Sequence, residues 1–327
     1  VATGHGELSG HIVQVMINRA CSEIAAGKRD VVAIVGGESE NSKRRLAKLD
    51  PEAIWDDETP GEPDVSFDSR EMYLPPQEIS AQIFKATTGF AMCETSLRRA
   101  RGETPAAHRA RISRISARMS DVASKNPYAW MQQPCSPEEI AEATPKNRLI
   151  AYPYTKLMTS NIAVDQAAAV IVCSAEAAKR FGLHEDRFVH LRASTEMNYT
   201  TAFSERIDLH EHPGQVLAGR RILEVLGRSA ADFEHIDLYS CFPLAVQAGA
   251  AAIGLDPDTE RPLTVTGGLT FSGGPFGNYV VQSTARMVEV LREDPNALGL
   301  VGGVGGFFAK FSFGAYSMDP GDEAQPR

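Results

Sequence analysis

The sequence has little of three features that mark common classes of protein. No apolar run approaches the roughly 20 residues that a helix needs to cross a bilayer, and the polar N-terminus does not resemble a signal peptide. Positive charge is in deficit, with a formal net charge of -9. This deficit argues against nucleic acid as the main partner, because phosphate binding requires a basic surface. These absences predict a cytoplasmic protein with no membrane span.

Cysteine is sparse as well. The five cysteines are odd in number, lie far apart and never form a C-x-x-C pair. This spacing predicts reduced thiols and offers no zinc or disulfide framework. Neither a P-loop nor a dinucleotide-binding G-x-G-x-x-G motif with its acidic partner is found. The 327 residues, 43% of them hydrophobic, are enough for two domains that each bury a core.

What the sequence does have is a cluster of glycines at 264–279. A strand-like run at 262–266 precedes them, and an apolar helix pattern that begins at Val280 follows. Glycine allows left-handed backbone and the close approach of a ligand or a second strand, while Pro275 fixes its own φ. The glycines alone fit two interpretations. One is a ligand-binding loop between strand and helix, and the other is a structural crossover in a tightly packed sheet.

Other segments predict an alternation of helices and apolar strands. They are a helix at 11–26 with a strand at 30–39, a strand and helix at 164–182, a helix at 206–227, a buried strand, turn and helix at 235–247, and two strands around a glycine turn at 299–316. Such alternation is typical of a layered α/β protein.

The order and spacing of these segments resemble the thiolase superfamily. The segments at 235–247, 264–279 and 299–316 resemble the three active-site loops of its C-terminal half, and 11–39 resembles the helix that carries the nucleophile with the strand after it. Further stretches are similar to bacterial thiolase-like proteins named acetyl-CoA acetyltransferases, relatives of the sterol-carrier-type thiolases. These stretches are 125–130, 147–148, 152–158, 237–243 and 264–274.

The resemblance implies an α/β fold of the thiolase-like αβαβα layered type. An N-terminal domain at 1–185 would hold a mostly helical insertion, the loop domain, at about 40–149, and a C-terminal domain would span 186–327. The resemblance also implies strands and helices that precede the nucleophile helix, which are missing here or supplied by another chain. The polar stretch 319–327 resembles a linker, and a further C-terminal domain often follows it in this subgroup.

Within the insertion, prolines and an acidic run mark a surface excursion, and a long helical stretch at 77–122 follows, interrupted at Pro105. Seven arginines lie between Arg98 and Arg118. On an amphipathic helix they predict a solvated face, although arginine is also suited to binding the phosphates of CoA.

A thiolase needs a cysteine nucleophile at a helix N-terminus, a histidine that activates it, a second cysteine as acid/base, and an oxyanion hole. The matching positions carry Gly10 or Ser9 for the nucleophile, Gly274 for the histidine, Tyr239 for the oxyanion-hole residue, and no cysteine at 299–306. The full set is absent. We therefore expect neither Claisen condensation nor thiolysis through a cysteine acyl-enzyme.

The side chains that stand at these loops define the candidate site. The catalytic candidates are Tyr239, Cys241 and Tyr279, and the substrate-binding candidates are Ser9, Gly273, Gly274, Pro275, Asn278, Gln282 and Lys310. Tyrosine can donate a hydrogen bond to a carbonyl or act as acid/base. Structural alternatives remain for several of them: packed aromatics for the tyrosines, a core position for Cys241, a left-handed turn for Asn278, and a solvated amine for Lys310.

Two weaker patterns involve histidine. His210 and His212 have an H-x-H spacing, but no third metal ligand is evident, so we predict no metal site. His5 and His11 flank Ser9, so that a Ser–His pair is an alternative to a helix-N-terminal turn.

The resemblance implies CoA or an acyl-CoA thioester as ligand and no covalently bound cofactor. It leaves two main functions: a CoA-thioester enzyme of fatty-acid or sterol side-chain metabolism with altered chemistry, or a catalytically silent acyl-CoA-binding or scaffolding protein. A retro-aldolase that uses tyrosines and a small OB-fold partner is a further alternative. The run at 31–35 is apolar without alternation and is expected to be buried on both faces, which favours a homodimer or a heteromer.

Overall fold

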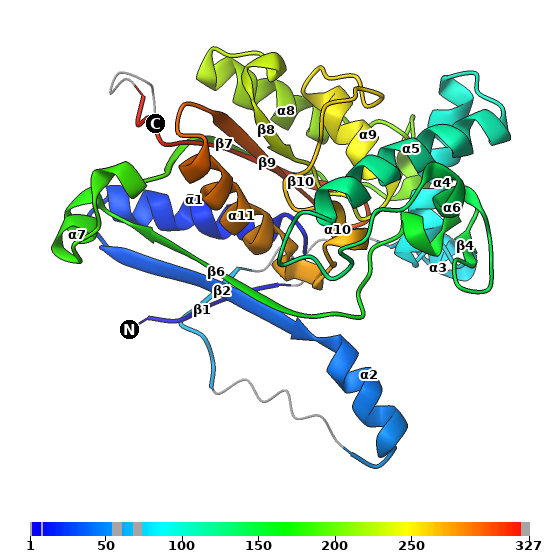
Figure 1. Cartoon of the computed structure of the whole chain (residues 1–327), viewed down its shortest axis with the longest axis horizontal. Helices are drawn as coiled ribbons and strands as arrows, with labels where there is room; N and C mark the ends of the chain where they lie inside the picture. Colours follow the sequence, from blue (N-terminus) through cyan, green and yellow to red (C-terminus); the bar gives the residue numbers. More distant parts are fainter. Residues whose placement is uncertain (1, 8, 54–60, 68–73, 322–327) are drawn as a thin grey trace.

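Two β-sheets with helices between and above them form the core (Figure 1). The structure is a computed structural model that describes residues 2–7, 9–53, 61–67 and 74–321. The larger sheet has the strand order β7-β10-β9-β8. Its strands are β7 (His190–Asn198), β8 (His235–Asp237), β9 (Leu298–Gly305) and β10 (Lys310–Ser317). The smaller sheet pairs β2 (Val31–Ser39) with β6 (Asp165–Cys173) in antiparallel register.

Amphipathic helices fill the space between the sheets. Helices α1 (Ile12–Ala25) and α11 (Tyr279–Glu293) lie there, because each presents apolar residues at helical spacing, such as Ile12, Val13 and Ile17 on α1. Helices α8 (Pro213–Leu226) and α9 (Pro243–Ala252) lie on the other side of the larger sheet. The order of layers is therefore β, α, β, α.

Glycines end several of these helices where the sequence predicts. Gly27 follows α1 with φ 66°, and Gly227 is the left-handed C-cap of α8 with φ 61°. The predicted strand at 30–39, the strand and helix at 164–182 and the strand pair at 299–316 are confirmed within one or two residues. The helix predicted at 206–227 begins only at Pro213, because a proline at the first turn starts it there.

Residues between β2 and β6 form the mostly helical part of the chain. Its elements are α2 (Glu40–Leu49), α3 (Pro76–Ser80), α4 (Ala86–Ala100), α5 (Pro105–Ala123), α6 (Pro137–Ala141), β4 (Leu149–Ala151) and β5 (Tyr154–Thr155), with β1 (Gly4–Gly6) and β3 (Val65–Phe67) paired in parallel beside them. The break predicted at Pro105 is confirmed, since this proline starts α5 and the Thr104 hydroxyl accepts a hydrogen bond from the Ala107 amide. The chain also breaks between α3 and α4.

Shorter elements complete the described chain. They are the 3₁₀ turns η1 (Lys156–Met158), η2 (Glu185–Arg187), η3 (Phe203–Glu205), η4 (Ala230–Asp232) and η5 (Phe276–Asn278), with α7 (Ala175–Arg180) and α10 (Gly268–Phe271). The acidic run at 56–58 and most of the predicted tail lie outside the described residues. Among the helices that are described, none combines the length and the apolar character that crossing a bilayer requires.

The arginines of α4 and α5 do not all form the solvated face that we predicted. Arg111 is only 4% exposed, and its guanidinium donates to Glu103 at 2.8 Å and faces Asp258 at 3.5 Å. Glu103 in turn contacts His108, which also bonds the fully buried Glu94. Because Asp258 belongs to the loop after α9, this network joins the helical insertion to the rest of the molecule.

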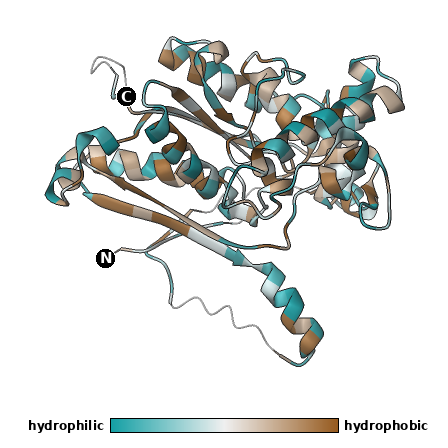
Figure 2. Cartoon of the chain, viewed as in Figure 1, coloured by the Kyte–Doolittle hydropathy of each residue, from teal (hydrophilic) through white to brown (hydrophobic). Residues whose placement is uncertain are grey.

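The apolar strand β2 is not buried on both faces, contrary to our prediction. Val35 is 67% exposed, and Ile171 on the paired strand β6 is 70% exposed. Helices α1 and α11 cover the inner face of this sheet, and no described element covers the outer face, where hydrophobic residues are visible along both ribbons (Figure 2). The described chain thus supplies four of the five layers expected of the fold.

The run at 262–266 is not a strand, because a buried carboxylate organises it differently. Asp237, at the end of β8, is fully buried and accepts hydrogen bonds from the Thr264 and Thr266 hydroxyls, from the Val265 and Thr266 amides, and from the Tyr279 hydroxyl. The chain therefore curls around one side chain. This ties the glycine loop and the start of α11 to the larger sheet.

Replacing Asp237 by asparagine should cost about 2 kcal/mol or more of unfolding free energy, since an amide group would face several donors that then lack an acceptor. Chemical denaturation of Asp237→Asn against the unchanged protein measures this. Asp30→Asn is the matched control, because Asp30 makes an exposed ion pair with Arg180, and such pairs contribute less than about 1 kcal/mol. Equal losses in the two variants would contradict the proposed role of Asp237.

Candidate functional site

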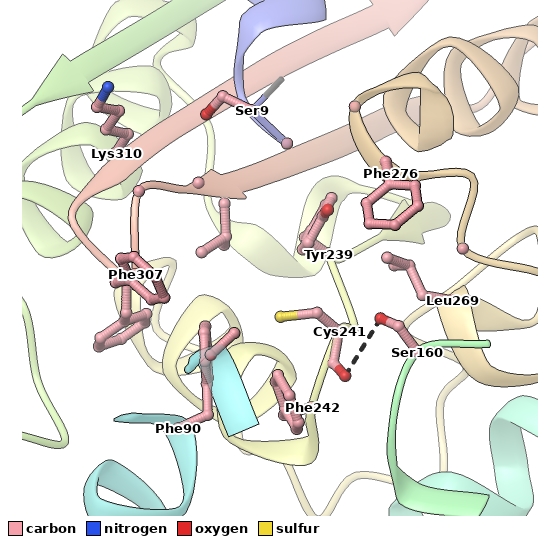
Figure 3. A pocket seen from close by; sticks show the side chains of 18 of the residues that line it. Ser9, Phe90, Ser160, Tyr239, Cys241, Phe242, Leu269, Phe276, Phe307 and Lys310 are labelled. Carbon is pink, nitrogen blue, oxygen red and sulfur yellow. Dashed lines mark hydrogen bonds between the residues drawn. The ribbon is translucent and has the colours of Figure 1, made fainter. Parts of the chain in front are cut away.

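A cavity of about 770 Å³ opens where segments from both halves of the chain meet (Figure 3). Its lining comes from the turn before α1, the start of α4, the stretch after η1, the β8–α9 turn, the glycine loop and the β9–β10 turn. Ser9, Tyr239 and Gly274 all line it, and residues 304–306 represent the fourth loop. The segments that we matched to active-site loops thus converge on one cavity.

Gly10 allows three of these segments to meet. A Cβ atom at this position would clash with the carbonyl oxygen of Val304 and would lie 2.6 Å from the Tyr239 hydroxyl. Any larger residue would push β9 or Tyr239 away from the N-terminal end of α1. Of Gly10 and Ser9, the two residues that we matched to the nucleophile position, only Ser9 brings a side chain to the cavity.

Aromatic rings form much of the cavity wall. The rings of Phe90 and Phe242 stack with centroids 4.7 Å apart. Phe276, Phe307 and Phe308 also line the cavity, and all three have left-handed backbone with φ of 40°, 55° and 60°. Bulky residues adopt this conformation at a cost of about 1–3 kcal/mol each, and such residues cluster at ligand sites. A mostly apolar wall with a few polar groups is typical of small-molecule sites.

Polar side chains also line the cavity, and those of Ser9, Lys310, Tyr239 and Cys241 are among them. The Ser9 hydroxyl lies 2.8 Å from Nδ1 of His11. The Lys310 ammonium lies 3.4 Å from the Glu7 carboxylate, although only 3% of the lysine is exposed. Tyr239 packs edge-on against Tyr279, and its hydroxyl makes no hydrogen bond within the described part of the chain. Cys241 is partly exposed to the cavity.

Burial sets the protonation of these groups. It lowers the pKa of His11 to about 4, with help from the positive charge of Lys310. Burial likewise raises the pKa of the Cys241 thiol and of the Tyr239 hydroxyl well above their usual ranges. The backbone amides near the start of α9 act in the opposite direction on Cys241, but burial outweighs them. Near neutral pH the cavity is therefore lined by a thiol and by a phenol that can donate a hydrogen bond, and a neutral imidazole lies behind Ser9.

Five of the ten predicted site residues line the cavity: Ser9, Tyr239, Cys241, Gly274 and Lys310. The other five are absent from the described lining and lie behind it: Gly273, Pro275, Tyr279, Asn278 and Gln282. Tyr279 is fully buried, and its hydroxyl is shared by Asp237 at 3.0 Å and Thr266 at 2.7 Å. Asn278 packs against the backbone of Gly36 on β2, and its side-chain amide has no hydrogen-bond partner among the described residues.

Sequence reasoning missed the aromatic wall and Glu7. The pair Phe307-Phe308, directly after Gly305-Gly306, was a usable signal. Two large apolar residues are unusual in a glycine turn between two strands. Phe90 and Phe242 gave no such signal. They belong to separate helical segments that only the tertiary fold brings together.

The H-x-H pair does not act as a unit. His210 hydrogen-bonds Ser96 at 3.0 Å, whereas His212 caps α8 by accepting from the Gly214 amide at 3.1 Å. In the part of the chain that the structure describes, no three histidine, cysteine or carboxylate side chains are grouped as metal ligands would be.

Comparisons with known proteins agree with this geometry, although no protein-family model matches the chain. An acetyl-CoA acetyltransferase of Methanothermobacter thermautotrophicus is 26% identical over 199 residues, which are 56% of this chain and 50% of that protein. Sterol carrier protein 2 of Oryctolagus cuniculus is 26% identical over 184 residues, or 51% of this chain and 33% of that protein.

Solved structures match nearly the whole chain. A monomeric SCP2-thiolase-like protein type 1 from Mycobacterium smegmatis superposes with a TM-score of 0.80 and 32% identity, covering 97% of this chain and 62% of that one. An Ltp2–ChsH2(DUF35) aldolase reaches 0.71 at 16% identity (95% of this chain, 78% of that one), and the Acat5 thiolase of Ascaris suum in complex with coenzyme A reaches 0.61 at 18% (94% and 77%). The last two likenesses show the fold alone.

These comparisons support the predicted resemblance to the thiolase superfamily, and the prediction of a thiolase-like α/β fold is confirmed. It spans half the length of the Methanothermobacter relative, a third of the rabbit protein and 62% of the Mycobacterium protein.

Stability should fall as pH drops from 7 to 5. Burial lowers the pKa of both His11 and His212 to about 4, and Arg206 contributes at His212. Unfolding releases them to an ordinary pKa of about 6.5, so the unfolded chain takes up protons that the folded chain does not. The stabilisation is complete above pH 6.5 and falls by up to about 1.4 kcal/mol per pH unit for each histidine.

Urea denaturation across this pH range measures the slope. The variants His11→Gln and His212→Gln should each flatten it, whatever their own stability. His184→Gln, at an exposed position, should leave the slope unchanged. An unaltered slope in the double variant would show that other groups carry the pH dependence.

Proposed function

We propose that this protein binds acyl-CoA thioesters in the cavity and acts on them in fatty-acid or sterol side-chain metabolism without a cysteine-bound acyl intermediate. The observation that carries the proposal is the convergence of the four matched loops on one aromatic-walled cavity. Further support comes from the acetyl-CoA acetyltransferase relatives and from the coenzyme A complex of the Ascaris thiolase, which has the same fold.

Tyr239 is the group that we assign to the thioester carbonyl. Its hydroxyl lies at the cavity, stays protonated because burial raises its pKa, and has no hydrogen-bond partner within the described residues. A neutral phenol placed in this way can donate to a carbonyl oxygen or a developing alkoxide. Cys241 does not serve as nucleophile in this proposal, because burial disfavours its thiolate.

The remaining predicted site residues receive two kinds of role. Ser9, Gly274 and Lys310 line the cavity and would contact the substrate. Tyr279, Gly273, Pro275, Asn278 and Gln282 would act indirectly by shaping the glycine loop. Gly273 supports this assignment, since its φ is 116° and a Cβ there would clash with Gln166.

Two alternatives remain, and each has an observation in its favour. A catalytically silent acyl-CoA-binding or scaffolding protein fits the lining, which within the described residues contains one cysteine and no histidine. A retro-aldolase that acts with a small OB-fold partner fits the unpaired Tyr239 hydroxyl, and one protein of the same fold is an aldolase complex with a DUF35 partner.

Titration calorimetry with CoA and with a β-hydroxyacyl-CoA tests the proposal. Both should bind, and Tyr239→Phe should weaken the β-hydroxyacyl-CoA by about 3- to 10-fold, because one neutral hydrogen bond contributes about 0.5–1.5 kcal/mol. Tyr152→Phe is the matched control, since Tyr152 is 49% exposed and absent from the lining.

A parallel assay with acetoacetyl-CoA and CoA should yield no acetyl-CoA above background. Robust acetyl-CoA formation that disappears in Cys241→Ser would overturn the proposal, as would the failure of CoA and both acyl-CoAs to bind. Binding without turnover of the β-hydroxyacyl-CoA, alone or with a DUF35 protein, would favour the silent alternative. Cleavage only with the partner would favour the retro-aldolase.

We also propose that the outer face of the β2/β6 sheet is covered by a second polypeptide, in a homodimer or a heteromer. Val31, Val35 and Ile171 are exposed there by 39%, 67% and 70%, and β2 pairs only with β6 among the described strands. An open strand edge beside an exposed apolar face is a common site of association. The similar Mycobacterium protein is described as monomeric, so association would distinguish this chain.

Light scattering at micromolar concentration measures the assembly. We expect a mass above 35.4 kDa and a shift towards monomer in Val35→Lys. Ile207→Lys, at a fully exposed residue outside this sheet, should leave the mass unchanged. A stable, soluble 35.4 kDa monomer would contradict the proposal.

The cytoplasm is the compartment that we propose. All five cysteines are free thiols, and free thiols persist in a reducing environment.

A further inference from the structure

The proposed function gives Ser9 no more than a substrate contact, and it gives no role to His11, the partner of Ser9. The Ser9 hydroxyl and Nδ1 of His11 are 2.8 Å apart, and the two residues are 7% and 3% exposed. Ser9 and Tyr239 both line the cavity, as Figure 3 shows. A serine hydroxyl hydrogen-bonded to an imidazole is the basic unit of an activated oxygen nucleophile.

Two glycines, Gly305 and Gly10, leave room for this pair. A Cβ at Gly305 would clash with the Ser9 hydroxyl oxygen and lie 3.2 Å from Nδ1 of His11. Gly10 lies between Ser9 and His11 in the sequence. Because it has no side chain, the Tyr239 hydroxyl can lie close to its backbone. The fold therefore holds a hydroxyl, an imidazole and a phenol together at one end of the cavity.

The surroundings of the pair act on it in opposite directions. Burial keeps the imidazole neutral at ordinary pH, so Nδ1 is open to a proton, but the same burial makes it a weak base, so proton transfer has to accompany bond formation. Ser9 lies just before helix α1, whose N-terminal end favours negative charge. The Lys310 ammonium, which pairs with Glu7, also lowers the pKa of His11.

We infer that Ser9 is a nucleophile and His11 its base, and that the pair accepts the acyl group of a thioester bound in the cavity. The substrate class is an acyl thioester with an apolar acyl chain, because phenylalanines surround the site. The inference rests on the proposed function for the identity of the thioester. It adds a covalent acyl-serine and a hydrolytic outcome to that function.

Water is the only reactant that this reaction needs besides the thioester. The Ser9 oxygen bonds to the thioester carbonyl carbon while its proton passes to Nδ1 of His11, and Tyr239 donates to the carbonyl oxygen. The carbon–sulfur bond then breaks, and the proton moves from His11 to the leaving thiolate, which releases the free thiol. Water, deprotonated by His11, attacks the acyl-serine, releasing a carboxylic acid and restoring the Ser9 hydroxyl. No group is oxidised or reduced.

The test begins with the unchanged 327-residue protein and a fluorophosphonate, which reacts with activated serines and needs no CoA. Peptide mass mapping should place the adduct on Ser9. A second measurement follows the free thiol released from butyryl-CoA. Ser9→Ala should abolish labelling at this peptide and lower thiol release by about 100-fold or more, and His11→Gln should slow both by about 100-fold, the range of general-base catalysis.

Ser124→Ala is the control, since Ser124 lies outside the cavity and its hydroxyl bonds only the Asp121 carbonyl among the described residues. It should match the unchanged protein in both measurements.

Calorimetry with CoA on each variant shows that binding survives and separates the two proposals. Unlabelled Ser9 in a protein that binds CoA would overturn the inference and leave the proposed function standing. Labelled Ser9 in a protein that binds no CoA thioester would support the pair and overturn the proposed ligand. Thiol release that persists in Ser9→Ala would also overturn the inference.

Discussion

The buried carboxylate of Asp237 is the constraint on which the site depends. It lies at the end of β8 and gathers donors from the glycine loop and from the start of α11. Burial raises the pKa of this carboxyl, which the surrounding hydrogen bonds oppose. A buried acceptor with so many donors fixes the loop because any displacement would leave several of them unpaired. Through this loop it also fixes Tyr279, against which Tyr239 packs at the cavity.

Close backbone approach is the second condition for the cavity. At Gly10, Gly268 and Gly305 a side chain would collide with a neighbouring segment, so glycine at these points lets α1, the β8–α9 turn and the β9–β10 turn converge. Phe307 and Phe308, which follow Gly305 and Gly306, have left-handed backbone, and both line the cavity. Burial keeps three groups in and behind the cavity wall neutral, because it lowers the pKa of His11 and raises the pKa of Tyr239 and of Cys241.

The apolar outer face of the β2/β6 sheet concerns assembly and is separate from the cavity. The same strand pair packs on α1 and α11 through its inner face, so a partner on the outer face would stiffen the layer that supports both helices. Gly36 on β2 touches Asn278 just before α11. This contact offers a physical route by which association could influence the glycine loop.

Most of the layered fold followed from the sequence alone, because helix and strand periodicity, glycine stops and proline starts are local properties. The sequence also predicted that the usual cysteine and histidine set is absent, and it supplied five of the residues that line the cavity: Ser9, Tyr239, Cys241, Gly274 and Lys310. It misread 262–266 as a strand, because propensity ignores a buried Asp237 nearly 30 residues away. Only the tertiary structure decided which predicted residues reach the cavity, that Phe90 stacks on Phe242 in its wall, and that Ser9 bonds His11. Those outcomes depend on long-range packing and burial, which no local pattern encodes.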